Sequence, residues 1–452
     1  MKRTLLMVAA MFVMAAPVAN AQIDTSLGFA DIQDVNVEKV RAGLKKQDAA
    51  VADAKKAAKA ATWVKRGQAY YNAANDPTAG VFAGLNETVL LNTVGSKVAE
   101  AGEDVVVNGA KLRKYTCDNF DAYCQGGQIV FVVATTVIDP NALQVAYDSY
   151  NKAYELSPKV EKKVNEGMTN IMNKHIFNAQ GHYGIGKLTE AASEFFNAYK
   201  VSCHPSVNHP DTVDVYNAAV MATVGGDFKN GLTYVDEAIK LNYMEGGETY
   251  YYKSVCLYNL DRKDEAKEVL KEGITMYPTN NNIIETLLQY YNEDENSNPR
   301  DIIPMVRRAI AKDPSNANLH LGMGRIHAKL GELDNAIASM QTAVQLNPAD
   351  FYANFYLGDT YLEQASLLEG DLNRLPFPTT ADAKAAYDQA LKLVNDKFAA
   401  SVVPFETAYG LNPKEIATVE RLKNVTFRLR ETSPEMKAKY EKFNDLYNSM
   451  RQ

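Results

Sequence analysis

The stretch "ANLHLGMGRIHAKLGELDNAIASMQTAVQLNPAD", residues 317–350, decides the fold. Small residues stand at fixed places in it: Gly324 is the eighth residue, Ala336 the twentieth and Ala343 the twenty-seventh. Small side chains there let two helices approach closely, and larger side chains fill the gaps between them. Pro348 ends the second helix, because proline lacks an N–H group and clashes with the preceding turn. The stretch therefore predicts a pair of antiparallel helices, A and B.

The same pattern recurs upstream, which indicates a stack of similar units rather than one motif. The unit 247–280, for example, has Ser254 at the eighth place and Ala266 at the twentieth. The further units are residues 283–316, 212–245 and a weaker copy at 172–205, whose helix A we expect to begin near Lys159. Stacked units of this kind bury one continuous core.

The spacing resembles that of the tetratricopeptide repeat. The resemblance covers nearly all of residues 60–447 and implies an all-α fold, an α-solenoid of antiparallel helix pairs. The start "KAAKAATWVKRG" and the tyrosine-rich units also resemble exported tetratricopeptide-repeat proteins of Bacteroidota, a looser match than the repeats themselves.

Two units are split. "WVKRGQAY", residues 63–70, begins a helix A whose partner helix is "AYDSYNKAYELSP", residues 146–158. In the unit 351–413, helix A at 351–365 is separated from "VVPFETAYGLNP" by a "LPFP" loop and an added helical segment from about Ala381. The last unit, 416–447, is charged and degenerate, as expected of a terminal cap.

Residues 76–141 are predicted to form a β-rich insertion in the first repeat. Two β-prone runs flank Asn108 and Gly109, a strong signal for a hairpin turn. Residues 128–138 read as a third strand, and Cys117 and Cys124 lie between it and the hairpin. We hypothesise a local disulfide between these two cysteines, which would stiffen a small sheet.

The chain's start is typical of a secretory signal. Lys2 and Arg3 precede a short apolar run, and Ala19 and Ala21 are the small residues before a cleavage site at Gln22. No cysteine follows that site, so we expect a periplasmic protein that is not a lipoprotein. The predicted domains are 1–21 signal peptide; 22–59 N-terminal helix, continuing through Tyr71; 60–158 split first repeat; 159–350 solenoid; 351–413 repeat with insertion; and 414–452 cap.

The composition and net charge narrow the classes of molecule that this protein is expected to bind. The formal net charge of −7 argues against nucleic acid, which binds to a basic face. No later apolar run is long enough for a transmembrane helix. Tyrosine is abundant at 26 residues against a single tryptophan, and tyrosine both packs and forms hydrogen bonds at surfaces.

No catalytic constellation stands out, so we expect a non-enzymatic protein without a cofactor or bound metal. The one cluster of metal-type residues is "CHPSVNHPD", residues 203–211. It could hold zinc, but its ligands lack the paired, regular spacing of closed zinc sites. A proline-containing connector between two repeats is the preferred interpretation.

The family resemblance implies that repeat positions 2, 5, 9, 12 and 13 of helix A line a concave groove. Carried over by register, these positions predict a partner-binding set: Tyr216, Tyr251, Tyr258, Tyr291, Arg325, Lys329, Tyr352 and Phe355. Aromatic residues and arginine dominate binding hot spots. The competing interpretation is that these tyrosines pack between neighbouring A helices.

The expected function is a scaffold or adaptor that binds a protein or peptide in this groove, in envelope assembly or secretion. A tyrosine-lined groove that stacks sugar rings of a glycan or of peptidoglycan is the alternative. A metal protein or enzyme centred on residues 203–211 is a third hypothesis. The partner's identity, the pathway, the oligomeric state and the role of the insertion do not follow from the sequence.

Overall fold

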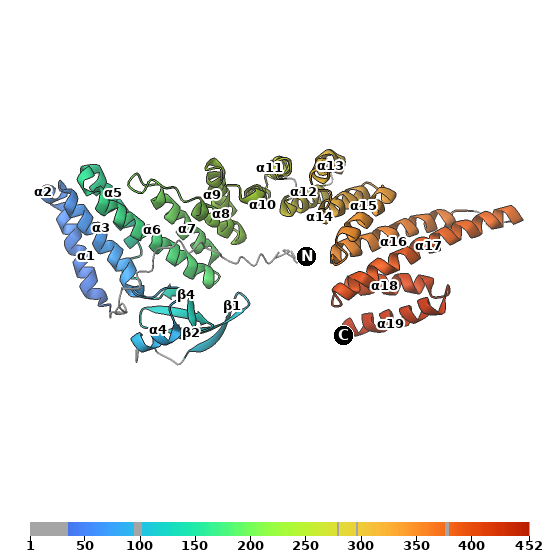
Figure 1. Cartoon of the computed structure of the whole chain (residues 1–452), viewed down its shortest axis with the longest axis horizontal. Helices are drawn as coiled ribbons and strands as arrows, with labels where there is room; N and C mark the ends of the chain where they lie inside the picture. Colours follow the sequence, from blue (N-terminus) through green and yellow to red (C-terminus); the bar gives the residue numbers. More distant parts are fainter. Residues whose placement is uncertain (1–34, 95–101, 278–279, 295–296, 376–378, 452) are drawn as a thin grey trace. The chain divides into compact units, whose positions relative to one another are not determined.

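A computed structural model describes residues 35–94, 102–277, 280–294, 297–375 and 379–451 (Figure 1). The predicted signal peptide lies outside these ranges. The chain divides into two compact units, with the boundary between Asp214 and Val215. Among the described helices, none combines the length and apolar composition that crossing a bilayer requires.

Unit 1 begins with three helices where the sequence predicted one. They are α1 (Val37–Ala52), α2 (Ala54–Ala57) and α3 (Ala60–Asn75). The first break comes at Asp53, whose backbone is extended and whose carboxylate accepts the N–H groups of Lys55 and Lys56. An aspartate in this role starts a new helix. The second break, at the extended Lys59, precedes Trp63, whose indole N–H donates to the carbonyl of Ala57 at 2.8 Å.

The two helices of the split first repeat pack against each other in the structure. Helix α5 (Ala142–Leu156) packs along α3, although the two are 66 residues apart in sequence. Ala146, Tyr150 and Ala153 of α5 are fully buried there. The next pair is α6 (Glu161–Gly184) with α7 (Leu188–Ser202), so helix A of that repeat does begin close to Lys159. The fold class predicted from the sequence is confirmed in this unit.

The insertion is a four-stranded antiparallel meander. Its strands are β1 (Glu103–Val107), β2 (Ala110–Thr116), β3 (Phe120–Gln125) and β4 (Gln128–Ala134), in that order across the sheet. The turn between β1 and β2 is Asn108–Gly109, with φ values of 50° and 81°. Such positive φ values suit asparagine and glycine, which is why the pair marks the hairpin. Strand β3 was not predicted.

Two helices pack against this sheet. On one face, Tyr115, Phe120 and Ile129 pack with Leu90 of α4 (Glu87–Val94), a helix in a segment whose structure the sequence left open. The edge strand β4 packs against α6. A Cβ atom at Gly181 of α6 would lie 2.5 Å from the carbonyl oxygen of Val132, so glycine is required for this close approach.

The structure contradicts a disulfide between Cys117 and Cys124: both are free, buried thiols. The backbone N–H of Cys117 donates to the carbonyl of Phe120, whereas Cys124 pairs with Arg113. The two cysteines thus lie about 13 Å apart along the β2–β3 ladder at ~3.3 Å per residue, too far for a bond that needs Cα atoms within about 7 Å. Burial raises the pKa of each thiol to about 11.

Unit 2 is a second stack of helix pairs. The pairs are α8 (Thr212–Val224) with α9 (Phe228–Lys240), α10 (Glu248–Asn259) with α11 (Lys263–Met276), α12 (Asn281–Glu293) with α13 (Ile303–Lys312), α14 (Ala317–Lys329) with α15 (Leu333–Leu346), α16 (Phe351–Asn373) with α17 (Ala381–Leu411), and α18 (Ile416–Leu429) with α19 (Pro434–Met450). Helix α8 begins just before the unit boundary.

Helix α12 shows that its repeat is two residues longer than the repeat that follows it. Asn280, Asn316 and Asp350 each cap the N-terminus of an A helix. Asn280 and Asn316 are 36 residues apart, whereas Asn316 and Asp350 are 34 apart. The extra length lies in the connection from Asp294 to Ile302, which contains a short 3-10 helix, Pro299–Ile302. The sequence register, carried back from Pro314, was therefore wrong by two residues on α12.

The last split repeat also differs from expectation. Its added helical segment is not separate, because α17 runs without a break from Ala381 to Leu411 and contains Pro404 in its interior. Proline removes one helical hydrogen bond and usually ends or bends a helix. Here Pro404 is buried and α17 packs along α16 and α18, contacts that hold the helix together.

Candidate protein-interaction surface

The A helices α10, α12, α14 and α16 lie next to one another in unit 2. With α12 in its corrected register, repeat positions 5, 9, 12 and 13 place a matching set of side chains on the same side of each helix. We call this set the A-face: Tyr251, Val255 and Tyr258 of α10; Glu285, Gln289 and Glu293 of α12; Leu321, Arg325 and Lys329 of α14; and, with position 2, Tyr352, Phe355 and Asp359 of α16. None of these residues is fully buried.

On α10 the A-face is aromatic. Tyr258 stacks on Tyr290 with ring centroids 3.9 Å apart, and its hydroxyl donates to a carboxylate oxygen of Glu293 at 2.5 Å. Burial and the acceptor Glu293 raise the pKa of Tyr258 to about 12, so its hydroxyl remains protonated. Tyr251 is half-buried beside Tyr252. One ring face of Tyr258 is therefore already occupied within the protein.

The middle of the A-face carries opposite charges on adjacent helices. Helix α12 contributes Glu285 and Glu293, and α14 contributes Arg325 and Lys329. Burial raises the pKa of Glu285 above its usual value, and the positive charge of Arg325 opposes that shift. The Arg325 guanidinium also lies 4.9 Å from the ring centre of Tyr356. An acidic strip thus borders a basic strip.

The α16 end of the A-face is again aromatic. Tyr352 is 51% exposed, the most exposed tyrosine among the predicted binding residues. Phe351 and Tyr356 flank it at ring distances of 5.2 and 6.3 Å. Phe355 is half-buried and packs edge-on against Phe405. These contacts hold Tyr352 in an ordered but accessible aromatic group.

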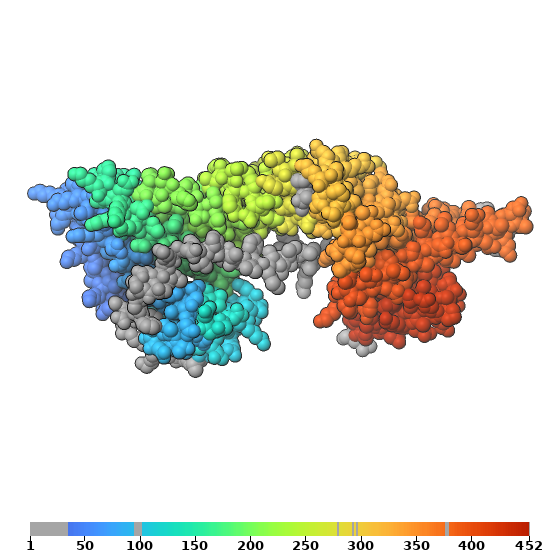
Figure 2. All heavy atoms as spheres, in the orientation of Figure 1, coloured from blue at the N-terminus to red at the C-terminus, as the bar shows by residue number. Residues whose placement is uncertain are grey.

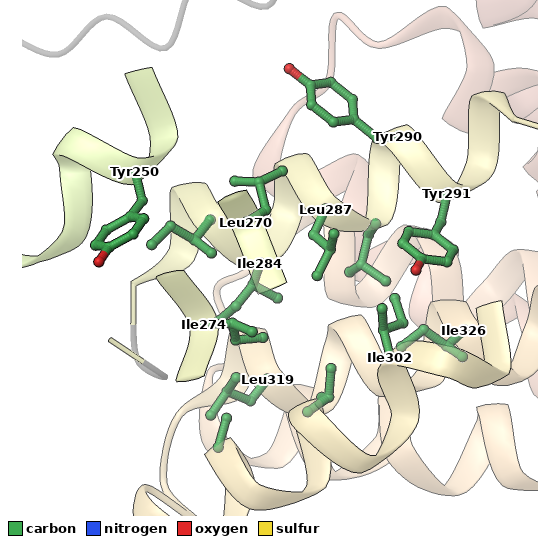
Figure 3. Packing of buried hydrophobic residues seen from close by; sticks show 14 of the residues in the cluster. Tyr250, Leu270, Ile274, Ile284, Leu287, Tyr290, Tyr291, Ile302, Leu319 and Ile326 are labelled. Atoms are coloured by element: carbon green, nitrogen blue, oxygen red, sulfur yellow. The ribbon is translucent and has the colours of Figure 1, made fainter. Parts of the chain in front are cut away.

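Two of the predicted binding residues are part of the core. Tyr291 is 3% exposed and packs with Ile302 and Ile326 (Figure 3). In the corrected register it takes position 11, where the repeat pattern calls for a buried aromatic residue. Tyr216 is 4% exposed and contacts the rings of Tyr243 and Tyr252. For both residues the packing interpretation is the correct one.

The loop at residues 203–211 is organised around His204, which is only 2% exposed. Its Nδ1 lies 2.8 Å from the hydroxyl of Ser206 and its Nε2 lies 3.2 Å from Oδ1 of Asn151. The ring also meets Tyr154 edge-on. Within the described ranges no group of three or more histidine, cysteine, aspartate or glutamate side chains is arranged to hold a metal.

Two family models match this chain. One, described as a TPR repeat, covers residues 324–364, and the other, described as a tetratricopeptide repeat, covers residues 247–280. The chain carries tetratricopeptide repeats. Such repeats are scaffolds for protein interactions, and both matched ranges contain A-face residues. No protein of curated function matches the sequence.

Several solved structures show partial similarity to this chain. YrrB, described as a TPR protein with an unusual peptide-binding site, is 15% identical over 51% of this chain and 97% of its own, with a TM-score of 0.32. A TPR protein from Bacteroides fragilis is 18% identical over 57% and 98%, with a TM-score of 0.29. MamA from Desulfovibrio magneticus is 16% identical over 41% and 94%, with a TM-score of 0.28.

Proposed function

We propose that the chain is a non-catalytic adaptor that binds an extended segment of a partner protein along the A-face. The observation that carries this proposal is the order of chemistry across adjacent helices: aromatic on α10, acidic on α12, basic on α14 and aromatic on α16. An extended peptide offers alternating side chains to such a row. Its affinity would come from a few aromatic and arginine contacts.

The order of aromatic, acidic, basic and aromatic helices also specifies which side chains the bound peptide must carry. The peptide would place a basic side chain against Glu285 and Glu293 and an acidic one against Arg325 and Lys329. Apolar side chains on either side of this charged pair would contact Tyr251 and Tyr352. A segment with the charges reversed would put like charges together, which disfavours the complex.

The test is capture of partners from envelope extracts by the purified chain, followed by mass spectrometry. The double variant Arg325→Glu with Tyr352→Ala is expected to lose the specifically captured partner. Its matched control is Lys312→Glu, a charge reversal at an exposed residue of the B helix α13, away from the A-face. If the double variant and the native chain capture the same proteins, the A-face is not the binding site.

A second experiment, binding to cell wall, separates a glycan ligand from a protein ligand. Binding to purified, protein-free cell wall, with loss in Tyr352→Ala, would favour the glycan alternative. A protein ligand is favoured because one ring face of Tyr258 is already stacked on Tyr290, which leaves less aromatic surface on which a sugar could stack.

We further propose that the chain acts in the periplasm as part of an envelope complex. The basic, apolar and small-residue pattern of residues 1–21 supports this setting. Sequencing the N-terminus of the protein from fractionated cells is the direct test. A mature chain that begins at Gln22 in the periplasmic fraction is expected, and an intact Met1 or a cytoplasmic fraction would contradict export.

A further inference from the structure

The negative charge of the whole chain conceals a basic segment at the start of unit 1. Residues 37–66, which form α1, α2 and the start of α3, hold nine lysine and arginine residues against three acidic ones. Their net charge is +6, whereas the whole chain carries −7. Figures 1 and 2 show α1 and α2 in blue at the margin of unit 1. The positive charge is therefore concentrated on the first helices of the stack.

The two arginines of this segment make contacts within the fold. Arg41 donates from Nε to the carbonyl oxygen of Ile138 at 3.2 Å. Arg66 pairs with the carboxylate of Asp48 at 2.9 Å and donates to the hydroxyl of Ser149 at 2.8 Å. Both arginines therefore hold α1 and α3 in place within unit 1.

The lysines of the segment, in contrast, are all exposed: Lys39, Lys45, Lys46, Lys55, Lys56, Lys59 and Lys65. Within the described ranges none of them forms an ion pair. Two of the three acidic residues nearby are occupied elsewhere, because Asp48 pairs with Arg66 and Asp53 caps the backbone of α2. The charge of these lysines is therefore not neutralised by the protein itself.

Two lysines of α1 lie on the side opposite its packed face. Leu44 is the buried residue of α1, and α1 packs against α3. At about 100° per residue, Lys39 and Lys46 lie about 140° and about 160° around the helix from Leu44, and within about 20° of each other. Together with the lysines of the turn into α3 they form a set that we call the basic end: Lys39, Lys46, Lys55, Lys56 and Lys59.

The other side chains of this surface are small. Ala42 and Ala49 are exposed and lie on the same outer side of α1 as Lys39 and Lys46. No large apolar side chain of residues 37–66 is exposed. Protein interfaces depend on aromatic residues and arginine, and lysine is depleted from them. The basic end therefore lacks the anchors that a protein partner would use, whereas a flat anionic surface requires only positive charge.

We propose that the basic end binds the surface of a membrane that contains anionic phospholipids. Clusters of about four to eight lysine or arginine residues on a helix are typical of such binding, and each residue strengthens it by roughly fivefold. Without exposed apolar side chains, the contact is with the headgroups and involves no insertion. The choice of lipid over nucleic acid rests on the export proposed above, which brings the chain to a membrane surface. The A-face lies in unit 2 and takes no part in this contact.

Cosedimentation of the purified chain with vesicles tests the proposal. Vesicles of equal parts phosphatidylcholine and phosphatidylglycerol should bind the chain, whereas vesicles of phosphatidylcholine alone should not. Binding should weaken steeply as salt is raised from about 0.1 M to about 0.5 M, because salt screens exposed charges. No binding to the mixed vesicles at the lower salt concentration, or binding that salt does not weaken, would overturn the proposal.

Neutralising the lysines locates the surface. The test variant combines four substitutions in the basic end: Lys39→Gln, Lys46→Gln, Lys55→Gln and Lys59→Gln. It should bind the mixed vesicles at least about a hundredfold more weakly than the native chain. The matched control loses the same charge at four exposed lysines of unit 2 and should bind like the native chain: Lys384→Gln, Lys392→Gln, Lys414→Gln and Lys437→Gln. Far-UV circular dichroism establishes that both variants are folded.

Two further outcomes would contradict the proposal. Equal binding by the test variant and the control would show that the basic end is not the contact surface. Displacement of the chain from the vesicles by duplex DNA or polyglutamate, at an equal concentration of negative charge, would assign the basic end to that polymer instead. Export is tested separately by sequencing the N-terminus, so the two proposals can fail independently.

Discussion

The ring of Tyr150 in α5 packs directly on the backbone of Gly67 in α3, across an insertion of more than sixty residues. A Cβ atom at position 67 would lie 2.9 Å from that ring. Gly167 of α6 approaches the same ring, so one fully buried tyrosine fills the space between three helices. The first repeat is therefore as tightly closed as the unsplit ones.

Gly67→Ala is expected to destabilise the protein by about 1–3 kcal/mol, the usual cost of extra volume in a packed core. The free energy of unfolding in urea, followed by helical circular dichroism, measures this effect. Gly43→Ala in α1 is the control, since a Cβ there has no neighbour within 4 Å. It should raise stability by up to about 1 kcal/mol through helix propensity. Equal effects of the two substitutions would contradict the close contact.

Truncation to alanine should destabilise the protein much more at Tyr291 than at Tyr352. Tyr291→Ala removes a buried ring and should lower the free energy of unfolding by about 3–5 kcal/mol. Tyr352→Ala, at a half-exposed ring, should change it by less than about 1 kcal/mol. The same denaturation experiment checks both. A stable Tyr291→Ala variant would restore the register predicted from the sequence and refute the corrected one.

Because Lys174 is buried, we expect the stability of the protein to depend on pH. Its ammonium donates to the hydroxyl of Thr78 at 2.5 Å, and burial lowers its pKa from 10.5 to about 8, with Glu194 opposing the shift. Between pH 8 and 10.5 the unfolded chain binds a proton that the folded chain does not, so stability rises with pH across this window. Below pH 8 the buried charge is a constant penalty.

The measurement compares the native chain with Lys174→Met, which cannot titrate. The difference in unfolding free energy between the two should change across this window in favour of the native chain as pH increases. Other titrating groups are common to both proteins and cancel. Parallel stability curves from pH 7 to pH 11 would show that Lys174 is not perturbed.

The four cysteines should differ in reactivity towards a thiol reagent. Cys203 is exposed, whereas Cys117, Cys124 and Cys256 are buried, and burial raises the pKa of each of these three thiols to about 11. In native protein at pH 8 we expect one fast-reacting thiol, followed by three more on unfolding. Fewer than four thiols in denaturant without reductant would instead reveal a disulfide.

The helix pairs could be predicted because their determinants are local and repeated. Ala336, Ala343 and Pro348 recur at equivalent places in other units, so each unit supports the interpretation of the next. The predicted repeat register was wrong on α12. Two extra residues in the connection to α13 shift this register, and no local sequence signal marks them. Tyr291 was consequently assigned to the surface.

Strand β3 was missed, whereas the added helical segment from about Ala381 was predicted but as separate from the helix that follows it. Phe120–Gln125 contains Asp121 and ends in a polar residue, and it becomes a strand because β2 and β4 pair with it on both sides. This strand is stabilised by its pairing with neighbouring strands and not by the β-propensity of its own residues. In α17, Pro404 lies inside one continuous helix, which packs against α16 and α18. Where neighbours decide the conformation, a single segment carries too little information.

The position of the insertion also sets an order of events during synthesis. Most repeats of this chain can close as soon as about 34 residues have left the ribosome, because their two helices are consecutive. Helix α3 must instead wait until Tyr150 has emerged, which lengthens the loop that closes and slows that step. The amino-terminal repeat, although made first, is thus expected to be held open while the sheet between its two halves is completed.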